Sequence, residues 1–141
     1  MTEHRKNVVA SVLARLRNVA REGGHSFNDV LQSYVIERFL ARLTQSPEAD
    51  TVLLKGALML RVWGVPRARP TMDIDVLRRG AADRAALAAI VRKCASTIDE
   101  SDGVTFDADD MSIDTIHEAG GYFGTRIRVP ARLENVRQVV Q

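Results

Sequence analysis

Two aspartates, Asp73 and Asp75, stand one residue apart in a short apolar segment that also contains Ile74 and Val76. Side chains at positions i and i+2 of a β-strand point to the same face, roughly 6.6 Å apart along the backbone. Two carboxylates this close repel each other unless a cation lies between them. Mg²⁺ prefers oxygen ligands and keeps positions open for water and substrate phosphates. The pair therefore predicts a Mg²⁺ or Mn²⁺ site at the end of a buried strand, as used in phosphoryl transfer.

The Asp-x-Asp spacing is a weak signal by itself, because it recurs at Asp107 and Asp109 and because most such pairs cap loops or lie in solvated turns. The context of Asp73 and Asp75 favours the metal interpretation. Apolar residues typical of a strand flank this pair, an Arg-Pro-Thr sequence precedes it, and a strand followed by a Lys-Gly pair lies upstream.

Lys55 and Gly56 follow the apolar run Val52–Leu54 and precede a helical pattern. Glycine lets the backbone approach a ligand closely, and the N-terminus of a helix presents unpaired N–H groups to a phosphate. Lys55 would add a positive charge. The alternative is a tight strand-to-helix turn with an exposed lysine. The segment is not a Walker loop, because the chain contains no Gly-x-x-x-x-Gly-Lys-Ser/Thr motif.

The composition describes one domain with a sizeable core. The chain has 141 residues, 45% hydrophobic and 27% charged, with a formal net charge of +2. No apolar run reaches the roughly 20 residues of a membrane span, and the polar start leads into no secretory signal. Cys94 is the single cysteine, which excludes an intrachain disulfide and suits a cytoplasmic protein.

Arginines gather around the acid pair, whereas a later stretch of the chain is acidic. The net charge is too small to indicate nucleic-acid binding. Basic residues around an acidic metal pair suit a polyanionic substrate such as a nucleotide or RNA, although solvated surface charge is the default for each residue taken singly. The arginines are Arg61, Arg67, Arg69, Arg78, Arg79 and Arg84.

Hydrophobic periodicity divides the chain into a helical first part and a mixed second part. Helices are predicted at 6–21, after a cap at Ser26 up to Leu43, from Gly56 to Trp63 and at 81–98. Strands are predicted at 51–54, 73–77, 104–106, 112–117, 122–129 and 136–140, with a hairpin at Gly120-Gly121. This order predicts a single α/β (α+β) domain over 1–141, with a helical lead-in at 1–48 and a mixed-sheet catalytic core with covering helices at 49–141.

Five segments resemble the AbiEii/AbiGii toxin-type nucleotidyltransferases and extend over nearly the whole chain. They are Glu37–Leu43, Val52–Trp63, Arg69–Val76, Asp102–Phe106 and Tyr122–Val129. The resemblance implies a polymerase-β-like nucleotidyltransferase fold and Mg²⁺-dependent transfer of a nucleotide from a nucleoside triphosphate to an acceptor such as RNA, including tRNA. It also implies a bacterial toxin, active in abortive infection, with a cognate antitoxin as partner.

The same resemblance assigns residues to the nucleotide. Gly56 and Ala57 occupy the place where many members have Gly-Gly or Gly-Ser near the triphosphate, with Lys55 beside them. Ala57 has no hydroxyl group, so only backbone contact is expected there. Arg69 and Thr71 match the segment that leads into the acids, where they would contact phosphate or support the loop.

The resemblance assigns Asp73 and Asp75 as the catalytic metal acids. Family members usually carry a third acid after the strand that corresponds to Val136–Val140, followed by a helical half with a catalytic lysine. Because bridging carboxylates hold two ions about 3.5–4 Å apart, little activity is expected of the 141 residues alone. The alternative is a truncated, non-catalytic module that binds an antitoxin or pairs with itself through the edge strand Val136–Val140. A phosphodiester hydrolase is a further rival, although no water-activating residue is evident.

Overall fold

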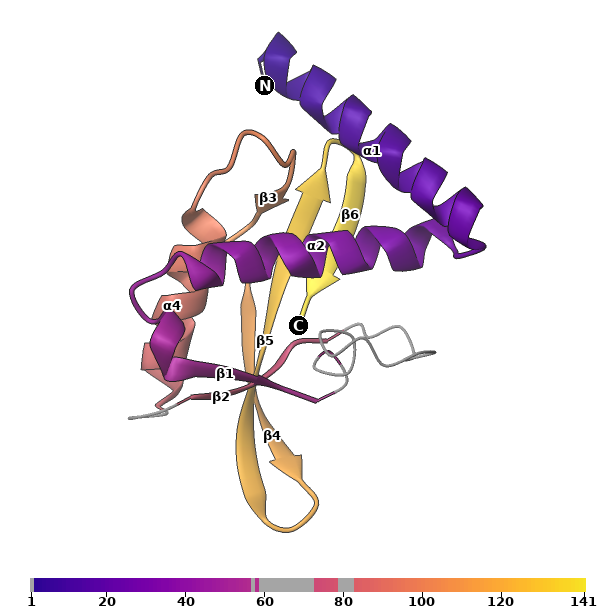
Figure 1. Cartoon of the computed structure of the whole chain (residues 1–141). Helices are drawn as coiled ribbons and strands as arrows, with labels where there is room; N and C mark the ends of the chain where they lie inside the picture. The colour runs from indigo at the N-terminus through magenta and orange to yellow at the C-terminus, as the bar shows by residue number, and fades with distance from the viewer. Residues whose placement is uncertain (1, 57, 59–72, 79–82) are drawn as a thin grey trace.

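The computed structural model of the chain describes residues 2–56, 58, 73–78 and 83–141 (Figure 1). The helices are α1 (Glu3–Gly23), α2 (Phe27–Thr44), a short 3₁₀ helix η1 (Ala49–Thr51) and α4 (Arg84–Ser96). The strands are β1 (Val52–Lys55), β2 (Asp75–Arg78), β3 (Thr105–Phe106), β4 (Ser112–Glu118), β5 (Tyr122–Leu133) and β6 (Val136–Val140). The helix predicted from Gly56 to Trp63 lies outside the described residues, apart from Gly56 and Leu58.

The two predicted N-terminal helices are present. α1 ends where Gly24 takes a φ of 65°, with its N–H donating to the carbonyl of Ala20. The Ser26 side chain accepts a hydrogen bond from the N–H of Asp29 at 3.1 Å, so α2 begins at the predicted cap. α2 packs against β6 and α1 packs against α2 (Figure 1), and the buried apolar faces of both helices belong to one core together with β5 and β6. This core contains Val9, Val12, Leu13, Leu16, Leu31, Val35, Phe39, Val129, Ala131, Leu133 and Val140.

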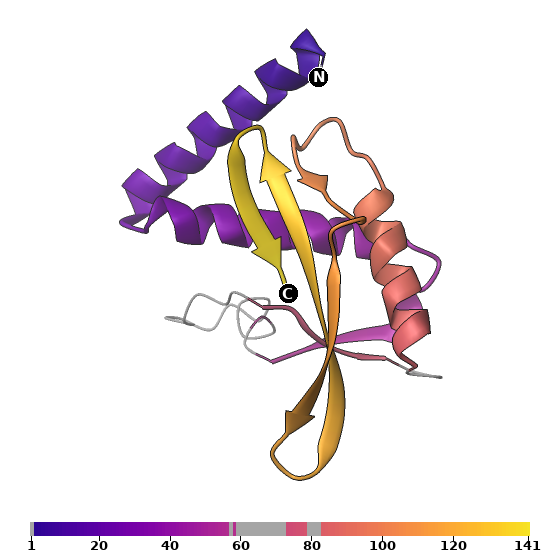
Figure 2. The same cartoon turned by 180° about the vertical axis from the view of Figure 1, so that it is seen from behind.

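The strands form two sheets, and every pairing among the described residues is antiparallel, so the mixed character expected of the sheet is not seen there. β1 and β2 form a two-stranded sheet. β5 pairs with β4, β3 and β6, and the predicted hairpin at Gly120-Gly121 joins β4 to β5. The β4–β5 hairpin projects away from the helices (Figures 1 and 2).

β5 continues past Val129, where the sequence predicted its end, and includes Pro130. Pro130 lies between the part of β5 that pairs with β4 and the part that pairs with β3. Its carbonyl accepts a hydrogen bond from the N–H of Asp107 at 2.8 Å. The nitrogen and carbonyl of a strand residue point to the same side, so the missing N–H of Pro130 faces the gap between two partner strands. The proline therefore removes no bond from the ladder, which is why it does not end the strand.

The sequence predicted an unpaired edge at β6, but two backbone carbonyls near the end of this strand already accept hydrogen bonds. The carbonyl of Val139 accepts a hydrogen bond from Gln32 Nε2 of α2 at 2.8 Å, and the carbonyl of Gln141 accepts one from the N–H of Ile74 at 2.7 Å. Free edge carbonyls are what a second strand would pair with. Their occupation weakens the alternative in which this strand serves for self-association.

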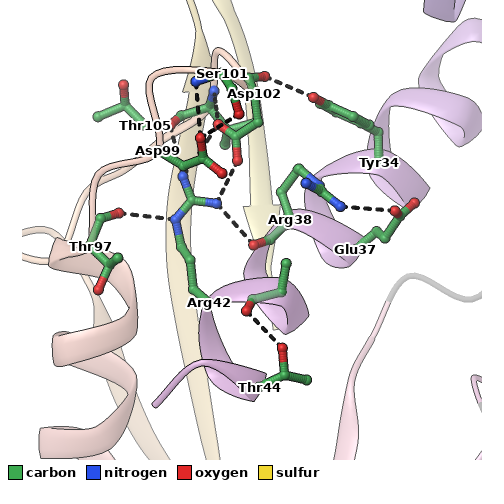
Figure 3. Close-up of polar contacts among 12 residues, drawn as sticks. Tyr34, Glu37, Arg38, Arg42, Thr44, Thr97, Asp99, Ser101, Asp102 and Thr105 are labelled. Carbon is green, nitrogen blue, oxygen red and sulfur yellow. Dashed lines mark hydrogen bonds and ion pairs between the residues drawn. The ribbon is translucent and has the colours of Figure 1, made fainter.

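A buried ion pair fastens α2 to the loop that follows α4 (Figure 3). Arg42 Nη1 lies 2.8 Å from Asp102 Oδ2, and both side chains are only 3% exposed. The guanidinium also donates to the carbonyls of Thr97 and Arg38, and the Tyr34 hydroxyl donates to the carbonyl of Asp102 at 2.8 Å. The charge of each partner is thus compensated inside the protein.

No helix in the described parts of the chain is long and apolar enough to cross a membrane.

Candidate functional site

Asp73 and Asp75 lie where the chain enters β2. The strand begins at Asp75, so the prediction that it begins at Asp73 is wrong by two residues. Between them, Ile74 donates its N–H to the carbonyl of Gln141, and its side chain packs against the core. Both aspartates are exposed. Ile74 therefore anchors the segment from the core side and leaves an acid on either side of it accessible to solvent.

The strands that carry this site are not buried, contrary to the sequence prediction. Leu53 of β1 and Leu77 of β2 stand opposite each other and are 44% and 55% exposed. A two-stranded sheet has two faces and two edges to cover, so a continuous apolar run does not ensure burial of both faces. The acids lie at the end of a partly exposed ribbon.

Gly56 brings its backbone against the Asp75 carboxylate. Lys55, the last residue of β1, pairs in register with Asp75, and Gly56 follows with a φ of 75°. A Cβ atom placed on Gly56 would lie 2.5 Å from Asp75 Oδ2, so no larger residue fits here without moving the acid. The Lys55-Gly56 turn and the acid pair, apart in the sequence, therefore meet in the fold. Lys55 itself is exposed.

An open hollow of about 490 Å³ adjoins Asp73. Described residues that line it include Gln32, Asp73, Arg128, Arg137, Gln138, Val139 and Gln141. Arg128 is held at its rim, because its Nε donates to Gln141 Oε1 at 2.9 Å and its Nη1 lies 3.1 Å from Asp114 Oδ2. Asp73, Arg128 and Arg137 thus line one hollow, and Asp75 is not among its described lining residues.

Arg128 and Arg137 were not among the predicted site residues. The signal that could have found Arg128 is the alternation of β5, in which Arg126 and Arg128 both fall on even positions. Arg132 joins this pattern only if the strand is extended through Pro130. Of the predicted nucleotide-binding residues, Ala57, Arg69 and Thr71 lie outside the described residues.

The two acids fit a divalent cation of the Mg²⁺ type. Mg²⁺ is usually held by one or two carboxylates together with waters and substrate phosphates, rather than by a full cage of protein ligands. Among residues 2–56, 58, 73–78 and 83–141, no group of three or more His, Cys, Asp or Glu side chains is placed to hold a metal ion. The described residues can therefore supply two carboxylate ligands and leave the remaining positions to water and phosphate.

Two exposed acids beside a glycine turn, at the end of a partly exposed two-stranded ribbon, can offer carboxylate oxygens to a metal ion that binds phosphate groups. The chain belongs to the family of the AbiEii nucleotidyl transferase toxins of type IV toxin–antitoxin systems, whose family model matches residues 38–141. The polymerase-β-like nucleotidyltransferase fold expected from the resemblance is the fold of this family. No significant match was found among curated proteins or among solved structures.

Proposed function

We propose that this protein transfers a nucleotide from a nucleoside triphosphate to an RNA acceptor such as tRNA, with Mg²⁺ or Mn²⁺ bound by Asp73 and Asp75. The observation that carries the proposal is the Asp75 carboxylate against the bare backbone of Gly56, within the segment that matches the nucleotidyltransferase family. When bound, the cation would neutralise charge on the phosphate oxygens. Action in the cytoplasm and control by a cognate antitoxin belong to the same proposal.

Each residue of the site has a role in this proposal. Asp73 and Asp75 supply the carboxylate oxygens that hold the cation. Gly56 lets the triphosphate approach the main chain, and Lys55 offers a positive charge to the phosphates from the end of β1. Catalysis then consists mainly of positioning and charge stabilisation. Contacts of Ala57, Arg69 and Thr71 with the nucleotide remain predictions from the family resemblance.

The test has two measurements, because little transfer is expected of the 141 residues alone: binding of a nucleoside triphosphate with Mg²⁺ or Mn²⁺ by calorimetry, and transfer of a labelled nucleotide to RNA. Asp73→Asn and Asp75→Asn keep the size of the side chain and remove its charge, so each is expected to lower the rate by at least about 10²–10³-fold. The matched control is the other Asp-x-Asp pair, with Asp107→Asn and Asp109→Asn combined. Asn variants with full activity, or a control that loses as much, would contradict the assignment. Chelation by EDTA should abolish transfer by the wild-type protein.

A further inference from the structure

The β5–β6 hairpin has one face in the core and one face turned outward. Val129, Ala131 and Leu133 of β5 are buried, whereas the residues that alternate with them, Arg128, Pro130 and Arg132, belong to the other face. On β6, Arg137 and Val139 are exposed and alternate with buried Val140. α2 crosses the core face, and the view from behind shows the opposite face uncovered in the part of the chain that is described (Figure 2).

The outward face carries a like-charge pair. Arg132 and Arg137 stand directly opposite each other in the β5–β6 register, and both are exposed. Like charges in this position destabilise a sheet, because cross-strand Cβ atoms are roughly 5 Å apart. Among the described residues, neither guanidinium has a carboxylate within ion-pair distance, although Asp107 and Asp109 line a second hollow together with Arg132. The two exposed guanidinium groups are therefore available to an anion.

Arg128 continues this face toward the acids. It lies four residues from Arg132 on the same strand, which is roughly 13 Å along β5. Its guanidinium is held by Gln141 and Asp114 at the rim of the hollow that Asp73 also lines. Positively charged side chains thus extend along the hairpin from the exposed pair Arg132 and Arg137 to Arg128, which lines the same hollow as Asp73.

We propose that this arginine face, made of Arg128, Arg132 and Arg137, binds the sugar-phosphate backbone of the RNA acceptor and directs its end toward Asp73. The proposal rests on the proposed function, because it assigns a surface to the acceptor of that reaction. Guanidinium groups bind phosphate through paired hydrogen bonds. A span of roughly 13 Å exceeds a single phosphate group and suits successive phosphates of one strand. Such contacts position the acceptor without reading its sequence.

The experiment measures binding of a fluorescein-labelled single-stranded RNA of mixed sequence by anisotropy, over a series of salt concentrations. EDTA is present and nucleotide is absent, so the result does not depend on the metal site. Arg132→Gln combined with Arg137→Gln is expected to weaken binding and to lower the slope of log K against log salt by about 1.4, or about 0.7 for each phosphate that is no longer neutralised. The matched control is Arg92→Gln with Lys93→Gln, which removes the same charge from the exposed side of α4. Arg137→Lys should retain most of the binding, because it keeps the positive charge.

Three results would overturn the proposal. They are an unchanged salt slope in the double variant, an equal loss in the α4 control, and loss of nucleoside triphosphate binding with RNA binding intact. The last result would mean that the arginines hold the triphosphate instead. Calorimetry with a nucleoside triphosphate and Mg²⁺ is run in parallel on all variants. If the wild-type protein bound RNA but no nucleotide, the proposed function would fail while the arginine face would still be tested. Circular dichroism confirms that each variant is folded.

Discussion

Charged side chains come together in two different ways in this protein. Arg42 and Asp102 are opposite charges, buried together and hydrogen-bonded to the backbone around them. Asp73 and Asp75 are like charges, exposed at the start of a partly exposed ribbon. A buried charge must be compensated within the protein, whereas exposed carboxylates remain accessible to solvent and can offer their charge to a cation. The comparison separates a scaffold contact from a candidate binding site, although both lie in segments that resemble one family.

The largest expected effect comes from breaking the buried pair. Arg42→Met leaves the carboxylate of Asp102 in the interior with the N–H of Val104 as a donor but without its cation. Removing one partner of a buried ion pair costs about 3–5 kcal/mol, so we expect the free energy of unfolding to fall by that amount. Urea denaturation followed by circular dichroism measures it.

The exposed acids provide the contrast to that variant. Asp75→Asn removes a solvent-exposed charge next to a like charge, so the free energy of unfolding should change by less than about 0.5 kcal/mol while nucleotide transfer is lost. Equal destabilisation by Arg42→Met and Asp75→Asn would break the distinction between scaffold and site.

A substitution at Gly56 tests whether the position of Asp75 depends on the turn at Lys55-Gly56. Gly56→Ala places a Cβ atom 2.5 Å from Asp75 Oδ2 at a φ of 75°, so both the backbone and the acid must shift. Backbone strain alone costs about 1–2 kcal/mol. We expect a loss of that size in unfolding free energy and, in addition, a loss of transfer activity measured at a temperature where the protein remains folded.

Gly24 supplies the matched control, because its φ is 65° and a Cβ atom there would meet nothing within 4 Å. Gly24→Ala should show the same backbone strain with unchanged activity. If both glycine variants lost activity to the same degree, the contact between Gly56 and Asp75 would have no special role.

Local signals in the sequence were sufficient for α1, α2 and α4 and for most of the described strands, whereas the helix predicted from Gly56 to Trp63 lies mostly outside the described residues. Ser26 marked the start of α2, and Gly120-Gly121 marked the β4–β5 hairpin, because caps and turns depend on neighbouring residues. The continuation of β5 through Pro130 depended on where two other strands end, which no local pattern reveals. The exposure of Leu77 likewise depended on which elements cover β2, and this is a property of the whole fold.

The candidate site, whose function stays a prediction, shows the same division between local and non-local information. Asp73, Asp75, Lys55 and Gly56 could be named from short motifs, and the contact between Gly56 and Asp75 follows from the β1–β2 register, which spacing alone does not give. Arg42 could have been suspected, since an arginine three residues after Phe39 falls on the apolar face of α2. Its partner Asp102 lies far away in the chain and could not be identified from periodicity.

Tyr34 offers a smaller test of the buried network. Its hydroxyl donates to the carbonyl of Asp102, and burial, followed by the charge of Asp102, raises the pKa of Tyr34 above its ordinary value of 10.0. The native state therefore favours the neutral hydroxyl, so its contribution to stability is full below pH 10 and is lost as the pH rises through the raised pKa. Tyr34→Phe should cost about 0.5–1.5 kcal/mol at pH 7.

Because the phenolate is disfavoured in the native state, the stability difference between wild type and Tyr34→Phe should shrink above pH 10. Urea denaturation at a series of pH values measures this difference. A difference that stayed constant across pH 10 would mean that the hydroxyl ionises equally easily in the folded and unfolded chains.

The last expected effect is a gain in stability and concerns Arg137. If Arg132 and Arg137 bind an anion together, the two guanidinium groups repel each other when no anion is bound. Removing one of the two charges should then relieve that repulsion. Arg137→Gln is therefore expected to raise the free energy of unfolding by about 0.2–1 kcal/mol at low salt. The gain should shrink as salt screens the two charges. Arg92 lies on the helix α4 and so has no cross-strand partner of like charge. Arg92→Gln should therefore give no such gain in stability. Thermal unfolding at low and high salt compares the two variants, and a stability loss in Arg137→Gln would show that this arginine, like Arg42, belongs to the scaffold.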